Sequence, residues 1–206
     1  EGGESAVANQ VGIVNSGNDN VIGLTRGNGN VISGNQVGIR ITDGTRIDIK
    51  GNLIGTNLAG DTPLGNSESG IEIIRDDQAD ITMEIGGLDV EDGNIISGNG
   101  IGVFMELIGG RNILLQRNYI GTDFSGTIDL GNETGVVVKG VDDLSIGRGL
   151  PITRFGESSN TIAFNNIGIY FAANLVDDEL SPLQNNEVIV RESSLFGNKF
   201  QAIVYD

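Results

Sequence analysis

The chain has 206 residues, with 33 Gly and 22 Asn but no Cys, His or Trp. A single domain is the default expectation at this length. Without histidine, Ser-His-Asp and Cys-His catalysis and His-ligated metals are excluded, and without cysteine there are no disulfides or thiolate sites. The net charge of −16 argues against nucleic acid and anionic membranes as partners, because both attract clustered Lys and Arg.

Local composition narrows the fold class and the setting of the chain. Abundant Gly and Asn disfavour long helices and favour turns. No apolar run approaches the ~20 residues of a membrane span, so we expect no membrane insertion. The sequence opens with Glu1-Gly2-Gly3-Glu4 and has no initiator Met, so we expect a processed or excised segment of a larger protein.

An internal repeat runs through most of the chain. The segment 30–35 (NVISGN) returns at 94–99 (NIISGN) and, in weaker form, at 160–165 (NTIAFN). A second element at 52–66 returns at 118–132. Short units of 22 to 24 residues, which start at Asn30 and Asn94, therefore alternate with long units of 42 residues.

Each unit contains three short apolar stretches in the same order, and Ile or Val alternate in them as in half-buried strands. The first stretches lie at 31–32, 53–54, 95–96, 119–120 and 161–162; the second begin with the Gly-aliphatic pairs at 38–39, 70–71, 102–103, 135–136 and 168–169; the third occupy 46–50, 81–85, 111–115 and 187–190. Residues 200–205 also have a strand pattern.

Such short strands cannot bury an apolar face within one unit, but stacked units can. The pattern predicts an all-β, right-handed parallel β-helix of about six to seven coils, three short strands per coil, as a single domain over 1–206. The additional residues of the long units should form excursions at 56–66, 122–132, 86–93 and 147–159. An antiparallel sandwich also has many short strands, but it does not require the same Asn at the same step of every unit.

The repeated asparagines predict two ladders, in which side-chain amides bond to the next amide and to turn backbone. The first ladder should contain Asn30, Asn52, Asn94, Asn118 and Asn160, and the second Asn35, Asn66, Asn99, Asn132 and Asn165. Their role is structural.

The motif at 118–132, Asn-x-Ile-Gly-Thr-Asp-x-x-Gly-Thr-x-x-Leu-Gly-Asn, and the shorter one at 94–99 resemble the repeats of bacterial secreted and cell-surface β-helix proteins. These belong to the broad pectate-lyase-like superfold, and the resemblance covers residues 30 to about 170. It implies a parallel β-helix and an extracellular or cell-surface location. Among enzymes of the superfold, polygalacturonases and uronan epimerases use a His, which this chain lacks. Lyases use carboxylate-held calcium with an Arg or Lys base, and that alternative stays open.

The outward side chains of the second strands form the most informative surface. If the aliphatic residue of each Gly-aliphatic pair points inward, Arg40, Glu72, Phe104, Val137 and Tyr170 point outward. Phe104, Val137 and Tyr170 then form an apolar stripe that is a candidate binding face for a glycan or a surface protein. The alternative is that the long excursions fold over the stripe and bury it.

Two charged groups are candidates for calcium or lyase chemistry. Asp89, Glu91 and Asp92 lie in one turn-rich excursion, where carboxylates suit calcium, although solubilising surface charge is the favoured explanation for them. The stretch 46–50 places Arg46, Asp48 and Lys50 on one outward strand face, which suits a lyase site or a solvated charged surface.

The sequence therefore predicts a non-enzymatic extracellular surface, adhesive or structural module with glycan binding. The alternative is a calcium-dependent polysaccharide lyase that acts on acidic glycans. No cofactor other than calcium is a candidate. Because a stacked fold leaves unpaired strand edges at its two ends, we also expect continuation of the rod or self-association through open coil ends.

Overall fold

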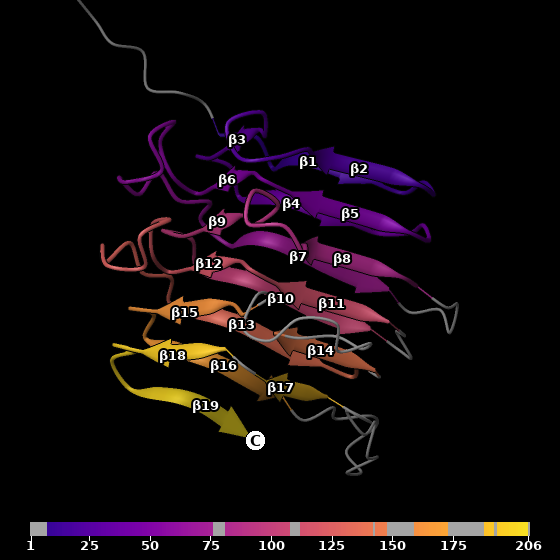
Figure 1. Ribbon diagram of the computed structural model, residues 1–206. Helices are drawn as coiled ribbons and strands as arrows, with labels where there is room; N and C mark the ends of the chain where they lie inside the picture. Colours follow the sequence, from indigo (N-terminus) through magenta and orange to yellow (C-terminus); the bar gives the residue numbers. More distant parts are fainter. Residues whose placement is uncertain are drawn as a thin grey trace, which may run out of the picture.

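The computed structural model describes residues 8–75, 81–107, 112–141, 143–147, 159–172, 188–191 and 193–205. These residues form a stack of short parallel strands, with the N-terminal strands at one end of the rod and the C-terminal strands at the other (Figure 1). Each turn of the chain adds one strand to each of three sheets, so the all-β parallel β-helix predicted from the repeat is confirmed.

Three parallel sheets, here called A, B and C, form the sides of the rod. Sheet A has the order β1 (Val11–Asn15), β4 (Val37–Ile41), β7 (Ser69–Arg75), β10 (Ile101–Leu107), β13 (Thr134–Lys139), β16 (Ile167–Ala172), β19 (Gln201–Tyr205). Sheet B contains β2 (Asn20–Gly23), β5 (Ile47–Lys50), β8 (Met83–Gly86), β11 (Ile113–Gln116), β14 (Leu144–Gly147), β17 (Ile189–Arg191). Sheet C contains β3 (Val31–Ile32), β6 (Leu53–Ile54), β9 (Ile95–Ile96), β12 (Tyr119–Ile120), β15 (Thr161–Ala163), β18 (Ser194–Phe196).

The core consists of aliphatic rows that run along the rod. In each sheet, pairing places one inward residue directly above its equivalent in the next coil, as in the row that contains Ile39, Ile71 and Val103. The fully buried members of these rows are Ile39, Ile71, Val103, Val136 and Ile169 in sheet A, Ile49, Ile85, Leu115 and Ile146 in sheet B, and Ile54, Ile96, Ile120 and Ile162 in sheet C. Small β-branched residues fill this narrow interior, which explains the low aromatic content of 5%.

Both predicted asparagine ladders are confirmed. In the first, Asn30, Asn52, Asn94 and Asn118 each donate Nδ2 to Oδ1 of the next member over 2.9–3.1 Å. From Asn52 onward, each amide also donates to the carbonyl of an inward residue of sheet B, as Asn94 does to Ile49 at 2.7 Å. The bonds satisfy polar groups at the corner between sheets B and C that would be costly to leave unpaired.

The second ladder is longer than predicted, because Asn9 precedes Asn35 and Asn198 follows Asn165. Its Nδ2 to Oδ1 distances lie between 2.9 and 3.2 Å along the whole series. In both ladders each bond between asparagines runs from Nδ2 of one member to Oδ1 of the member in the coil that follows in sequence. Asn30 and Asn9 are the exposed first members, whereas Asn52, Asn94 and Asn66 are fully buried.

The Gly of the Ile-Gly-Thr motif is required by the ladder. Gly55 and Gly121 have φ values of +87° and +86°, in the left-handed region that favours glycine. A Cβ atom on Gly55 would lie 2.3 Å from Oδ1 of Asn99, and one on Gly121 would lie 2.5 Å from Oδ1 of Asn165. The repeat therefore pairs each such Gly with an Asn of the following coil.

Four strands were not expected from the repeat. β1 and β2 form most of a coil that precedes Asn30, β14 completes the coil of β13, and β18 (Ser194–Phe196) adds the last strand of sheet C. The first stretches of the units are also shorter than a usual strand, with two residues in β3, β6, β9 and β12. The predicted strand at the C-terminus is confirmed as β19, and the excursion predicted at 147–159 lies almost wholly outside the described residues.

The described part of the chain contains no helix that is long and apolar enough to cross a membrane.

Candidate functional site

The outward side chains of sheet A form a continuous row, here called the outer row. Strand pairing places its seven members in register, in the order Val14, Arg40, Glu72, Phe104, Val137, Tyr170 and Val204. The predicted inward and outward assignment of the second strands is therefore correct.

The two halves of the outer row differ in chemistry. Arg40 forms an ion pair with Glu72 of the neighbouring coil. The next three members, Phe104, Val137 and Tyr170, are apolar or aromatic, as predicted, and are called the apolar segment below. Val137 is only 7% exposed, whereas Phe104 and Tyr170 are half-buried. The apolar segment therefore presents two aromatic side chains with a covered valine between them.

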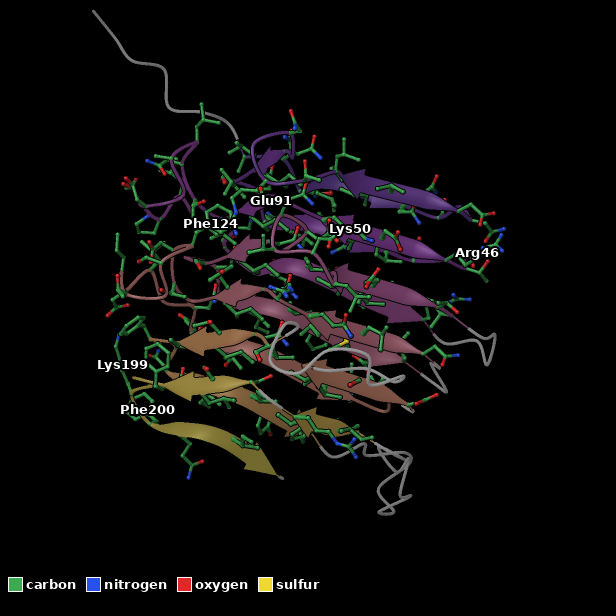
Figure 2. All side chains as sticks on the ribbon, in the orientation of Figure 1. Arg46, Lys50, Glu91, Phe124, Lys199 and Phe200 are labelled. Atoms are coloured by element: carbon green, nitrogen blue, oxygen red, sulfur yellow. The ribbon has the colours of Figure 1, made fainter. Side chains whose placement is uncertain are left out.

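The charged side chains of 46–50 do not form one group. Lys50 contacts Glu84 at 2.9 Å and Asp48 at 3.4 Å on the outer face of sheet B. Burial alone would lower the pKa of Lys50, but the hydrogen bond and charge of Glu84, with Asp48, outweigh it and raise that pKa. Arg46 instead lies just before β5, has a left-handed φ of +54°, and pairs with Asp19 of the preceding coil (Figure 2). Its expected position beside Asp48 and Lys50 on one strand face is wrong, because the left-handed residue ends the alternation.

The acidic candidates for calcium lie in the excursion between β8 and β9. Oδ2 of Asp92 accepts a hydrogen bond from the Asp89 amide at 3.3 Å, and Glu91 bonds to Arg26 through its main-chain carbonyl. Across the described ranges, no three Asp, Glu, His or Cys side chains come together as metal ligands.

A cluster on the outer face of sheet C was not predicted. The Arg26 guanidinium carbon lies 3.9 Å from the ring centroid of Phe124, and the ring of Phe124 meets Tyr119 edge to face. Arg26 also donates to the carbonyl of Val90 at 2.9 Å. Segments from three different coils, between β2 and β3, between β8 and β9, and after β12, thus meet over sheet C. A single Arg in a Gly-rich turn carries no sequence signal for such a contact.

The excursion after β12 is closed by a carboxylate. Oδ1 of Asp123 accepts hydrogen bonds from the amides of Thr127 and Ile128 at 3.2 and 3.0 Å, and Ser125 donates its hydroxyl to the same oxygen at 2.9 Å. Burial alone would raise the pKa of Asp123, but the Ser125 hydroxyl and these amides lower it to about 2. Asn57 holds the equivalent place in the excursion after β6, where its Oδ1 accepts from Asp61 and Thr62 amides.

A shallow groove follows the second ladder along the corner between sheets C and A. Its volume is about 480 Å³. Turn residues of successive coils line it: Gly65, Asn66, Ser67, Gly98, Asn99, Gly100, Gly131, Asn132, Glu133, Asn166 and Lys199. The amides of Asn66, Asn99 and Asn132 already bond through the ladder, so these three side chains are not free to select a ligand.

Comparison with models of protein families, with curated proteins and with solved structures gives no match for this chain. The resemblance to secreted β-helix proteins therefore rests on the motifs at 94–99 and 118–132.

Proposed function

We propose that the chain is a non-enzymatic β-helical module of an extracellular or cell-surface protein, a rod whose apolar segment binds a glycan or a surface protein. The register of Phe104, Val137 and Tyr170 on adjacent strands carries this proposal. Side chains in register on β10, β13 and β16 repeat at ~4.8 Å, so Phe104 and Tyr170 stand ~10 Å apart. That separation suits two rings of an extended sugar chain, with each aromatic side chain against one of them.

The rod supplies rigidity rather than chemistry. Aliphatic rows and two ladders fix every coil to the next, so the apolar segment is held by backbone pairing instead of by loops. Because the binding face is then pre-organised, little conformational entropy is lost when a ligand binds.

A glycan array tests this function directly. We expect the parent protein to bind a subset of extended glycans, and Phe104→Ala and Tyr170→Ala each to lower that binding at least about tenfold. Val14→Ala is the matched control, because Val14 belongs to the same row but lies three strands from Phe104. Equal loss in all three variants would contradict a role for the apolar segment, and an array on which the parent binds no glycan would exclude a glycan as its ligand.

The alternative of a polysaccharide lyase receives no support from Lys50. A lyase base must accept a proton, which needs a lowered pKa, and the carboxylates around Lys50 raise it. Incubation with polygalacturonate or alginate plus calcium, followed by ultraviolet detection of unsaturated products, separates the two functions. Turnover in that assay would replace the binding module by the lyase.

The proposed location is tested on intact cells that make the full-length protein. We expect an antibody against the rod to stain unpermeabilised cells or to detect the protein in the medium. Staining that requires permeabilisation would refute an extracellular or surface position.

A further inference from the structure

The chain contains two Asn-Gly pairs in very different surroundings, Asn28-Gly29 and Asn99-Gly100. Asn-Gly is the pair in which an asparagine side chain reacts most readily with the following backbone amide, because glycine has no side chain to obstruct the approach. From the contrast between these pairs we propose that Asn28 is a site of spontaneous deamidation, whereas the fold protects Asn99.

The surroundings of Asn28 leave the reacting groups free. Residues 25–28 form a β-turn, closed by a 2.9 Å bond from the Asn28 amide to the Thr25 carbonyl and with Gly27 at φ +84°. The Asn28 side chain is exposed, and its amide makes one long contact of 3.4 Å to the Thr25 hydroxyl. Within the described ranges the Gly29 amide, which is the nucleophile, donates no hydrogen bond.

Asn99 is held in the opposite state. It is 3% exposed, and its Nδ2 donates to the Ile54 carbonyl, the Ser97 carbonyl and Oδ1 of Asn132 at 3.1–3.2 Å. The Gly100 amide also donates to the Asn66 carbonyl at 3.2 Å. Attack by the Gly100 nitrogen would have to break both sets of bonds, so reaction requires local opening of the ladder.

The reaction at Asn28 needs water as its only co-reactant. The Gly29 nitrogen attacks Cγ of Asn28, a C–N bond forms, the bond from Cγ to Nδ2 breaks, and ammonia leaves. Water then opens the five-membered succinimide at either carbonyl and gives an aspartate or an isoaspartate. The product places a negative charge two residues from Arg26, whose guanidinium lies against Phe124.

The fold also preserves the reactive pair. A Cβ atom on residue 29 would lie 1.9 Å from the carbonyl oxygen of Gly51 in the next coil. Since any other residue at 29 would collide with the backbone, the rod requires glycine after Asn28. The glycine that makes Asn28 reactive is therefore a structural requirement of the stack.

Tryptic mapping after prolonged incubation of the folded protein in mildly alkaline buffer tests the proposal. Trypsin releases Asn28 in the peptide 27–40 and Asn99 in the peptide 76–111. We expect the first peptide to gain about 1 Da, with fragment ions that assign the change to Asn28, and the second to react at least about tenfold more slowly. Asn28→Gln should abolish the mass change in 27–40.

The same incubation in concentrated urea is the matched control. Once the ladder is unfolded, both Asn-Gly pairs should react at similar rates, which would show that the fold causes the difference. Equal rates at Asn28 and Asn99 in the folded protein would overturn the proposal. So would an Asn28 that stays intact when folded but converts in urea.

Discussion

The second asparagine ladder and the outer row of sheet A cross the same coils, yet they follow opposite rules. The ladder has the same residue in every coil, from Asn9 to Asn198. The outer row changes from an aliphatic residue to an ion pair and then to aromatic side chains, although its backbone register is equally regular. Both rows pass through the same regularly stacked coils, so regular stacking alone does not dictate which residues repeat.

The difference lies in what each side chain contacts. A ladder asparagine bonds to its own kind above and below, so a change at one position leaves unpaired groups in two neighbouring coils. An outer-row residue faces away from the core, so a substitution there alters contacts only with its direct neighbours on the sheet. Residues that recur in every coil, such as the ladder asparagines, therefore indicate the fold. Positions that vary from coil to coil, such as those of the outer row, are the ones that can carry a binding function.

The largest expected effect comes from Asn99→Ala in the middle of the ladder. It removes the acceptor for the Asn66 amides and the donor to Asn132. We expect the free energy of unfolding, measured by urea denaturation, to fall by about 3 kcal/mol. Asn9→Ala, at the exposed start of the same ladder, should cost less than about 1 kcal/mol. Equal losses in the two variants would show that burial of the unpaired groups does not determine how much a ladder asparagine stabilises the fold.

A smaller loss in the free energy of unfolding is expected for Arg26→Ala. This variant tests whether a residue outside the repeat also stabilises the rod. The variant loses the contact with the Phe124 ring and the bond to the Val90 carbonyl. The expected cost is about 1.5 kcal/mol in the same denaturation assay. Arg26→Lys keeps the charge without the planar stacking and should fall between parent and Ala. A loss as large as that of Asn99→Ala would break the contrast between repeated and unique positions.

The equivalent excursions after β12 and β6 differ in charge, because Asp123 in the first holds the place that Asn57 holds in the second. The Asp123 pKa of about 2 lies below the ordinary value of 3.8, so the stabilising bonds are present above pH ~4 and are lost as the pH falls toward 2. Since the group lies at the surface and is only partly buried, we expect Asp123→Asn to cost no more than about 1 kcal/mol at neutral pH and only a small fraction of that at pH ~2. Thermal melts of both proteins between these pH values measure the convergence. Parallel curves would contradict a role for the ionised carboxylate.

The smallest effect is expected in the charged half of the outer row. Arg40 and Glu72 form an ion pair on the outer face of sheet A, with side chains 34% and 12% exposed, so Arg40→Gln should change the free energy of unfolding by about 0.5 kcal/mol or less. The remaining difference should vanish at high salt, because screening removes the attraction in the parent. A loss that persists in high salt would mean that Arg40 packs structurally, and the outer row would then resemble the ladder.

Much of the fold could be predicted from the chain because each coil repeats a chemical requirement. The Ile-Gly-Thr glycines and the ladder asparagines recur at fixed steps, and they fixed the coils from Asn30 onward. A spacing of 33 residues continues through Asn66, Asn99 and Asn132, and one more step from Asn165 would have identified Asn198. β14 was missed although its buried Leu144 and Ile146 alternate as the inward residues of β5 and β8 do.

The surfaces were less predictable, since they depend on contacts between excursions that carry no periodic signal. The register of Phe104, Val137 and Tyr170 followed from the alternation of a strand, but the burial of Val137 did not. The contact of Arg26 with Phe124 joins residues almost a hundred positions apart in sequence. Arg46 was misplaced because a single left-handed residue ended the alternation.

Because every ladder asparagine donates in the same direction, any member can bond to any other that occupies the adjoining coil. The length of the rod can thus be changed by deletion or insertion of whole coils. Removal of residues 100–132 would place Glu133 after Asn99, join two equivalent turns and leave Asn66 and Asn165 as the neighbours of Asn99. The shortened rod would lose one rung of ~4.8 Å and the contact between Arg26 and Phe124, and its ladders would continue across the join. Duplication of the same segment would lengthen the rod by one rung. The number of repeat units therefore sets the length of the rod.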